Sequence, residues 1–269
     1  MDAVLLFSGQ GAQKVGMGKD LYDQYPVAKA LIEQADKALG ESLSAVMFEG
    51  PGEELTRTCN CQPALYVHGL ACLAVLKELV PSLNPVAAAG LSLGEFTAHA
   101  AAGTYSFEEG LRLVQKRGAF MEEACNATKG TMAAMIGGTD ENVIKLAQEC
   151  DVDVANFNCP GQTVVSGTEE GVAKAVAGAK AAGCKIAKKL NVAGAYHSRL
   201  MHSAMVKLAE ELKNISFGTP SMPVYCNYEA RVVEGPDDIR SMLEHQVCGS
   251  VRWTASMQKL VDQGHRLFI

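Results

Sequence analysis

Apolar residues along the chain form short continuous runs, separated by longer stretches with helical spacing. Residues 3–8 are apolar with little alternation, which is typical of a strand buried on both faces. Residues 85–89 form a second short apolar run and predict another strand. Apolar positions recur with the period of a helix in further stretches, which are 21–39, Pro63 to Pro81, 93–102 and 107–125.

The rhythm changes near residue 130. The pattern then predicts, in order, a strand over 131–136, a helix over 140–149, strands over 152–157 and 163–166, a helix over 168–182 and a strand over 185–190. The order βαββαβ is that of the ferredoxin-like unit. We therefore expect residues 130–191 to form a small insert, with 1–129 and 192–269 making the larger α/β part.

The remaining stretch returns to the longer α/β rhythm. It predicts a helix over 200–212, a strand over 224–227, helices over 237–246 and 253–263, and a strand that starts at 267–269. An α/β chain rarely stops inside a strand, so we expect the natural protein to continue with a turn and a closing helix.

Composition narrows the class of protein. The chain has 269 residues, of which 48% are apolar and 20% charged, as in an ordinary globular protein. A formal net charge of −6 argues against nucleic acid as a partner. The longest apolar stretches are broken by His68, Lys77 or Glu95, which argues against a membrane span. Nine cysteines with no CxxC pair indicate reduced thiols in the cytoplasm and no metal site.

Residues 90–94 read G-L-S-L-G, between a predicted strand and a predicted helix. That setting makes Ser92 a candidate nucleophile, because a sharp strand-to-helix turn with flanking glycines exposes the serine oxygen. The helix N-terminus would offer N–H groups to a developing oxyanion. A structural turn with a helix-capping serine is the alternative.

A serine nucleophile needs a base, and His197 is the candidate. It lies in a loop after a predicted strand and before a predicted helix, whereas the other five histidines fall in predicted helices or at surface positions. The alternative for His197 is a residue next to a helix cap. The loop Gly9-Gln10-Gly11 could supply an oxyanion N–H or be a flexible turn. Arg117 precedes a mid-helix glycine and could bind a carboxylate or be a solvated surface arginine.

Five ordered motifs carry a resemblance to a known family. They are F-S-G-Q-G-A-Q at 7–13, G-L-S-L-G-E at 90–95, Q-K-R-G at 115–118, N-F-N-C-P-G-Q at 156–162 and Y-H-S-R-L-M at 196–201. The chain resembles the malonyl-CoA:acyl carrier protein transacylases and the related acyltransferase domains of polyketide synthases. The resemblance implies an α/β-hydrolase-like large subdomain with a parallel sheet and an inserted ferredoxin-like small subdomain. Leu91 departs from it, because the family usually has His there.

The resemblance also implies ping-pong malonyl transfer from CoA to a carrier thiol, for fatty acid or polyketide synthesis, with no cofactor. The implied roles are nucleophile for Ser92, base for His197, oxyanion N–H groups from Gln10 and Leu93, carboxylate binding by Arg117, orientation of the histidine through the backbone of Gln246, and lining by Asn158, Gln162 and Tyr196. A bulky residue such as Tyr196 accompanies malonyl choice in related domains.

The expected partners are malonyl-CoA and an acidic acyl carrier protein, with no nucleic acid and no membrane. Lys185, Lys188, Lys189 and Arg199 are candidates for carrier docking, or else a solvated charged face. Two other functions stay open on the residues alone. A serine esterase or thioesterase would use water as acceptor, and a non-catalytic carrier-binding module would form no acyl-enzyme.

Overall fold

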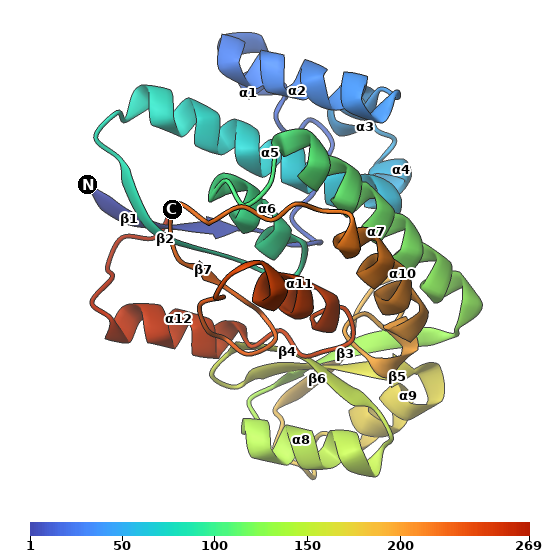
Figure 1. Ribbon diagram of the computed structural model, residues 1–269. Coiled ribbons are helices and arrows are strands. Elements are labelled where there is room, and N and C mark those ends of the chain that lie inside the picture. Colours follow the sequence, from blue (N-terminus) through green and yellow to red (C-terminus); the bar gives the residue numbers. More distant parts are fainter.

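A computed structural model describes residues 1–269 and has two sheets, each with its own helices (Figure 1). The larger part holds a parallel sheet. Its elements are β1 (Asp2–Phe7), α1 (Lys19–Gln24), α2 (Pro26–Leu39), α3 (Leu43–Glu49), α4 (Gly52–Thr56), α5 (Thr58–Leu79), β2 (Asn84–Gly90), α6 (Leu93–Ala101), α7 (Phe107–Ala127), a 3₁₀ turn (Arg199–Met201), α10 (His202–Lys213), β7 (Val224–Tyr225), α11 (Pro236–His245) and α12 (Trp253–Asp262).

The smaller part is an antiparallel sheet with two helices on its outer face (Figure 1). Its elements are β3 (Gly130–Ile136), α8 (Asp140–Glu149), β4 (Asp153–Cys159), β5 (Gln162–Thr168), α9 (Glu169–Gly178) and β6 (Ile186–Lys189). The strand order β4-β5-β3-β6 is the ferredoxin-like one. The predicted α/β class with a parallel sheet and a ferredoxin-like insert is confirmed, while the exact division at 130 and 191 stays a prediction.

The parallel sheet gathers the ends of three distant strands at one edge. The order is β1-β2-β7, with Phe7 opposite Gly90 and Ala89 opposite Tyr225. Residues 267–269 run parallel to β1 on its other side, through a bridge between Val4 and Phe268. Because ligands of open α/β sheets bind beyond the carboxyl ends of the strands, the loops after β1, β2 and β7 mark the expected place of a site.

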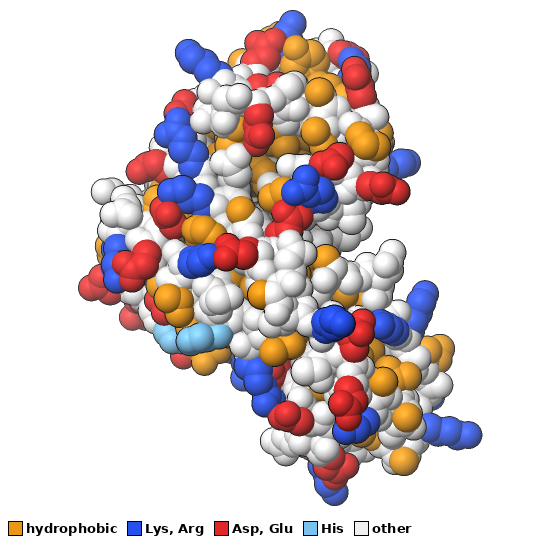
Figure 2. Space-filling view, turned by 90° about the vertical axis from the view of Figure 1, so that its right-hand side faces the viewer, with side chains coloured by type: hydrophobic (Ala, Val, Ile, Leu, Met, Phe, Trp, Pro, Cys, Tyr) orange, Lys and Arg blue, Asp and Glu red, His pale blue; other side chains and the backbone are white.

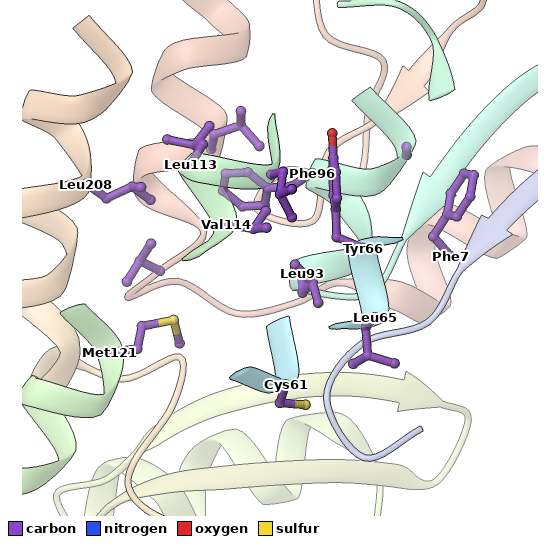
Figure 3. Close-up of a cluster of buried hydrophobic side chains, with 14 of the residues drawn as sticks. Phe7, Cys61, Leu65, Tyr66, Leu93, Phe96, Leu113, Val114, Met121 and Leu208 are labelled. Carbon is purple, nitrogen blue, oxygen red and sulfur yellow. The ribbon is translucent and has the colours of Figure 1, made fainter. Parts of the chain in front are cut away.

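The main hydrophobic core lies between this sheet and the helices α5, α6 and α7. Phe7, Tyr66, Phe96 and Val114 belong to this cluster and come from four different elements (Figure 3). Helix α5 is long and apolar enough to cross a membrane by length and composition alone, but 61% of that window is buried inside the protein. Its apolar character therefore belongs to the core.

Two element predictions were wrong at prolines, one at Pro26 and one at Pro63. The helix expected over 21–39 is two helices, because Tyr25 adopts an extended conformation before Pro26. Pro63 does not open its helix; α5 begins at Thr58 and continues through the proline. The short helices α3 and α4 lie in a stretch for which no element was predicted.

The two parts meet along a seam that leads to the cavity described below. Val251, just before α12, bridges Asn156 of β4, and Thr254 donates to the carbonyl of Phe157 at 3.1 Å. Figure 2 shows the two lobes from the side, with a narrower waist between them and with acidic and basic side chains interspersed over the face.

Candidate active site

The turn between β2 and α6 places Ser92 at the carboxyl edge of the parallel sheet. Its backbone has φ 55° and ψ −104°, which costs a residue with a side chain about 1–3 kcal/mol. Both flanking glycines are required by close packing. A Cβ on Gly90 would overlap the backbone of Gly94, and a Cβ on Gly94 would overlap the carbonyl of Phe7. The turn therefore has the strained geometry of a nucleophile elbow, which suits the predicted role of Ser92.

His197 lies beside this serine. Its Nε2 is 2.8 Å from Ser92 Oγ, and the ring is almost fully buried. The local sequence builds the loop, because Ser198 caps the 3₁₀ turn by accepting from Leu200 N while donating to the carbonyl of Ala195. His197 itself has φ 55°, so both members of the pair have left-handed backbones.

Two backbone carbonyls hold the other ring nitrogen. His197 Nδ1 lies 2.7 Å from Gln246 O and 3.1 Å from Gly249 O. Since carbonyls only accept, the proton sits on Nδ1 and the lone pair of Nε2 faces the serine. Burial, followed by the positive charge of Arg117, lowers the pKa of His197 to about 4, so the ring is a neutral base at neutral pH.

Arg117 is a buried cation beside Ser92. Its Nη2 donates to Ser92 Oγ at 3.0 Å and to Gln246 Oε1 at 2.8 Å, and its Nη1 donates to Gln62 Oε1 at 2.7 Å. Phe96 lies under the guanidinium at 5.0 Å from its ring centroid. The surface-arginine alternative is wrong, since Arg117 is 1% exposed. Burial lowers its pKa to about 10, which leaves it charged at neutral pH.

The glycine after Arg117 explains how a helix can bury this cation. A Cβ on Gly118 would lie 2.6 Å from the carbonyl oxygen of Thr58, so α7 can approach α5 closely only without a side chain there. The close approach brings Arg117 next to Gln62 of α5.

The reacting groups open into one cavity of about 280 Å³. The larger part contributes Ser92, Arg117 and His197, and the smaller part contributes walls. The lining residues are Gln10, Gln62, Leu91, Ser92, Leu93, Arg117, Met121, Met132, Asn156, Asn158, Val164, Leu190, Val192, Tyr196 and His197. A small, mostly apolar cavity with one fixed cation suits a short acyl group that ends in a carboxylate.

Gln10 and Leu93 border the cavity next to the nucleophile. Leu93 is the first residue of α6, where backbone N–H groups have no acceptor within the helix. Gln10 belongs to the loop that follows β1. These positions suit oxyanion donors, and that role stays a prediction.

Three further residues were predicted to line the cavity, of which Asn158 and Gln162 belong to the smaller part and Tyr196 to the larger. Asn158 and Tyr196 line the cavity, and the Tyr196 hydroxyl is 2.7 Å from Thr58 Oγ1. Gln162 does not line it. Its Oε1 accepts from Asn158 Nδ2 at 3.3 Å, so Gln162 contacts a residue that lines the cavity.

Sequence reasoning missed Gln62, Asn227 and the contacts of Glu95. A buried glutamine in an apolar helix could have drawn attention to Gln62, which is 1% exposed. Asn227 follows β7 at the carboxyl edge of the sheet, a position that could have been noted. No sequence signal showed that Glu95 would be buried completely.

The candidate docking residues do not form one cluster of free cations. Arg199 is paired with Asp151 and Asp153 at 2.7 and 3.0 Å, so its charge is compensated within the protein. Lys189 lies opposite Ala133 and pairs with Glu169 on the helix-covered face of the small sheet. Lys188 lies opposite Ala134, on the face that carries Met132 and the cavity.

Comparison with known proteins identifies the family. The model of the acyl transferase domain matches residues 4–269. The malonyl CoA-acyl carrier protein transacylase of Bacillus subtilis is 43% identical over 269 residues, covering 98% of this chain and 84% of the relative. The solved transacylase of Coxiella burnetii has a TM-score of 0.95 at 35% identity, covering 99% of this chain and 86% of that chain.

A second solved structure contains the partner named in its description. It is a malonyl-transacylase in complex with a type II polyketide synthase acyl-carrier protein, with a TM-score of 0.95 at 36% identity, covering 100% of this chain and 88% of that chain. The matches extend over both sheets and over the elbow, the histidine loop and the buried arginine. This chain belongs to the acyl transferase family.

Proposed function

We propose that this protein is a malonyl-CoA:acyl carrier protein transacylase, which moves malonyl from coenzyme A to a carrier thiol through an ester on Ser92. The observation that carries the proposal is the 3.0 Å contact between Arg117 Nη2 and Ser92 Oγ, both of which line the cavity. A fixed guanidinium beside the nucleophile selects an acyl group with a free carboxylate. The names of the relatives support the same activity.

In the first half-reaction, Ser92 Oγ attacks the thioester carbonyl while His197 Nε2 takes the hydroxyl proton. The negative charge that develops on the carbonyl oxygen is met by the N–H groups of Gln10 and Leu93. The carbon–sulfur bond then breaks, the imidazolium returns its proton to the leaving thiolate, and coenzyme A departs as the thiol.

In the second half-reaction, the carrier thiol gives its proton to His197 Nε2 and its sulfur attacks the ester carbonyl. The bond between the carbonyl carbon and Ser92 Oγ breaks, and the serine regains the proton from the imidazolium. Atoms and protons balance without any redox partner. An alcohol, an imidazole, N–H donors and a guanidinium supply every group that the steps need, so we propose that no metal or cofactor takes part.

Arg117 is held in position before a substrate carboxylate binds. Gln62 and Gln246 hold the guanidinium in place through their side-chain oxygens, so little side-chain freedom is lost when a carboxylate binds. An acetyl group would leave the buried charge of Arg117 without an anion, and burying a charge without its partner is costly. Malonyl is therefore favoured over acetyl.

The setting of the reaction is also part of the proposal. All nine cysteines are free thiols, which suits a reducing compartment, and we place the protein in the cytoplasm. The proposal covers carriers of fatty acid and of polyketide synthesis, because one relative is named simply as a malonyl CoA-acyl carrier protein transacylase and another as one of polyketide biosynthesis. For docking of the acidic carrier, Lys188 is the best placed of the predicted lysines, because it lies on the cavity side of β6.

Intact-protein mass spectrometry after brief exposure to malonyl-CoA tests the function. We expect the mass of one malonyl group on the wild-type chain and none on Ser92→Ala. The loaded enzyme is then divided between buffer and holo carrier protein. Transfer to the carrier thiol supports the proposal. Release of free malonate at the same rate in both arms would indicate a hydrolase, and absence of any adduct would indicate a binding module.

A further inference from the structure

Asn227 connects the two sides of the nucleophile elbow. Its Oδ1 accepts from the backbone N–H of Ser92 at 2.6 Å, and its Nδ2 donates to the carbonyl of Gly90 at 2.7 Å. The side chain is 2% exposed and comes from a segment 135 residues further along the chain. Helix α6 has no side-chain cap of its own at Ser92. One amide therefore closes a turn that the local sequence leaves strained.

Glu95 holds Asn227 in turn. Its Oε2 accepts from the backbone N–H of Asn227 at 2.9 Å and from Gln246 Nε2 at 2.8 Å. The carboxyl is fully buried in the first turn of α6, and it does not line the cavity. It therefore cannot touch a substrate in the cavity and acts only through its neighbours.

Gln246 connects Glu95 to Ser92, Arg117 and His197 through hydrogen bonds. Its Nε2 donates to Glu95 and to Ser92 O at 3.1 Å, while its Oε1 accepts from Arg117. Its backbone carbonyl holds His197 Nδ1. The amide can face only one way, because its oxygen accepts from the guanidinium of Arg117 and its nitrogen donates to Glu95 Oε2. Without that acceptor, nothing but Ser92 O would hold the amide nitrogen in this orientation.

We propose that Glu95 and Asn227 are positioning residues for acyl transfer, with Asn227 fixing the serine elbow and Glu95 fixing the Gln246 amide that orients Arg117. The proposal rests on the proposed function, because malonyl transfer is its readout. It predicts two separable effects. Loss of Asn227 misplaces the nucleophile for every acyl group, whereas loss of Glu95 also loosens the arginine that recognises the carboxylate.

Single-turnover loading of purified full-length protein separates these effects, with malonyl-CoA and acetyl-CoA as donors. The concentration of active sites is titrated by the acyl-enzyme formed. We expect Asn227→Ala to slow loading from both donors by a similar factor of about a hundred, as for a small misplacement of a reacting group, with the malonyl-to-acetyl ratio unchanged. We expect Glu95→Leu to slow malonyl loading and to lower that ratio.

The isosteric Glu95→Gln is the rescue variant. Its amide oxygen can take the place of Oε2 and accept from Asn227 and Gln246, so most of the loss in Glu95→Leu should be recovered. Thr97→Val, two residues further along the same buried helix, is the matched control and should load like the wild type. If Glu95→Leu does not fold, Glu95→Ala takes its place in the same comparison, because it also removes the acceptor for Asn227 N and Gln246 Nε2.

Wild-type rate constants and selectivity per titrated site in both Asn227→Ala and Glu95→Leu would overturn the proposal, even if their melting temperatures fell. A fall in selectivity for Asn227→Ala equal to that for Glu95→Leu would overturn the division of roles. If the wild-type chain itself forms no malonyl-enzyme, the proposed function fails. If the wild type loads and the variants load equally well, only the positioning roles fail.

Discussion

His197 Nε2 lies 2.8 Å from Ser92 Oγ, and both residues have φ 55°, a left-handed conformation that residues with side chains rarely adopt. Ser92 bends the chain between β2 and α6, and His197 bends it just before the 3₁₀ turn that begins at Arg199, and these two bends bring the side chains together. Proton transfer between them needs no rearrangement.

Removal of the imidazole should therefore remove proton transfer but not the nucleophile itself. We expect His197→Ala to slow malonyl loading of Ser92 by about a hundredfold to ten-thousandfold, the usual contribution of a general base. Stopped single-turnover reactions followed by intact mass measure the rate constant. His202→Ala is the control, because that residue is exposed at the start of α10. Equal rates for wild type and His197→Ala would contradict the role.

Removal of the guanidinium should change which acyl group is preferred. A charge-assisted hydrogen bond contributes about 1.5–3 kcal/mol, so Arg117→Ala should lower the malonyl-to-acetyl ratio of kcat/KM by about ten- to a hundredfold. Arg112→Ala, five residues earlier on α7 with an exposed side chain, is the matched control. An unchanged malonyl preference in Arg117→Ala would refute carboxylate binding by this residue.

The acid limb of the pH profile should lie unusually low. The base acts when unprotonated, and burial together with Arg117 lowers the pKa of His197 to about 4. Loading should stay level from neutral pH down to about 5 and fall to half near pH 4. Replacing Arg117 with Met removes a positive charge, so the half-maximal pH should rise. A wild-type midpoint near 6.5, the ordinary histidine value, would contradict this account.

The same histidine makes stability depend on pH. In the unfolded chain His197 protonates near its ordinary pKa of 6.5, but in the folded protein its pKa is lowered to about 4. Between these values the unfolded state binds more protons, so the free energy of unfolding falls as the pH drops from about 6.5 toward 4. Urea titrations across this window should show a smaller pH dependence in His197→Gln than in the wild type.

The contact between α5 and α7 should tolerate no side chain at position 118. Gly118→Ala places a Cβ against the Thr58 carbonyl, and such overpacking costs about 1–3 kcal/mol. Gly52→Ala is the control, because its Cβ would meet only Val15 at 3.8 Å. Urea unfolding measures both. Malonyl loading should also fall in Gly118→Ala, because Arg117 would shift with the helix.

Carrier docking can be separated from loading. Lys188→Glu should raise KM for the carrier protein but leave loading from malonyl-CoA unchanged, because the lysine lies on the exposed cavity side of β6 and touches no reacting group. Lys174→Glu, on α9 of the same part, is the control. Equal changes in both half-reactions of Lys188→Glu would count against docking at this strand.

The fold and part of the site are visible in the sequence because they depend on local patterns. The βαββαβ order follows from the spacing of apolar residues and turns. The turn at Ser92 follows from the pattern of Gly90, Ser92 and Gly94. Arg117 could be singled out because a glycine follows it inside a helix. Their catalytic and binding roles stay predictions until the variants are measured.

Contacts between segments that are distant along the chain could not be predicted from any local sequence pattern. Asn227 reaches Ser92 from 135 residues away, and nothing in its neighbouring sequence indicates that partner. Whether Arg199 is a free cation depends on Asp151 and Asp153, which only the packing of the small sheet brings near. The prediction at Pro63 was also wrong. Local propensity favours a helix that begins at this proline, but α5 begins at Thr58 and continues through it.

The cavity draws its chemistry and its walls from different sheets. Ser92, Arg117 and His197 belong to the larger part, while Met132 and Val164 come from the ferredoxin-like insert. Exchange of side chains on the inner face of that small sheet would alter the length and breadth of the acyl chain admitted, without moving any atom that makes or breaks a bond. The range of acyl groups accepted can thus change through the small sheet while the groups that carry out the reaction stay the same.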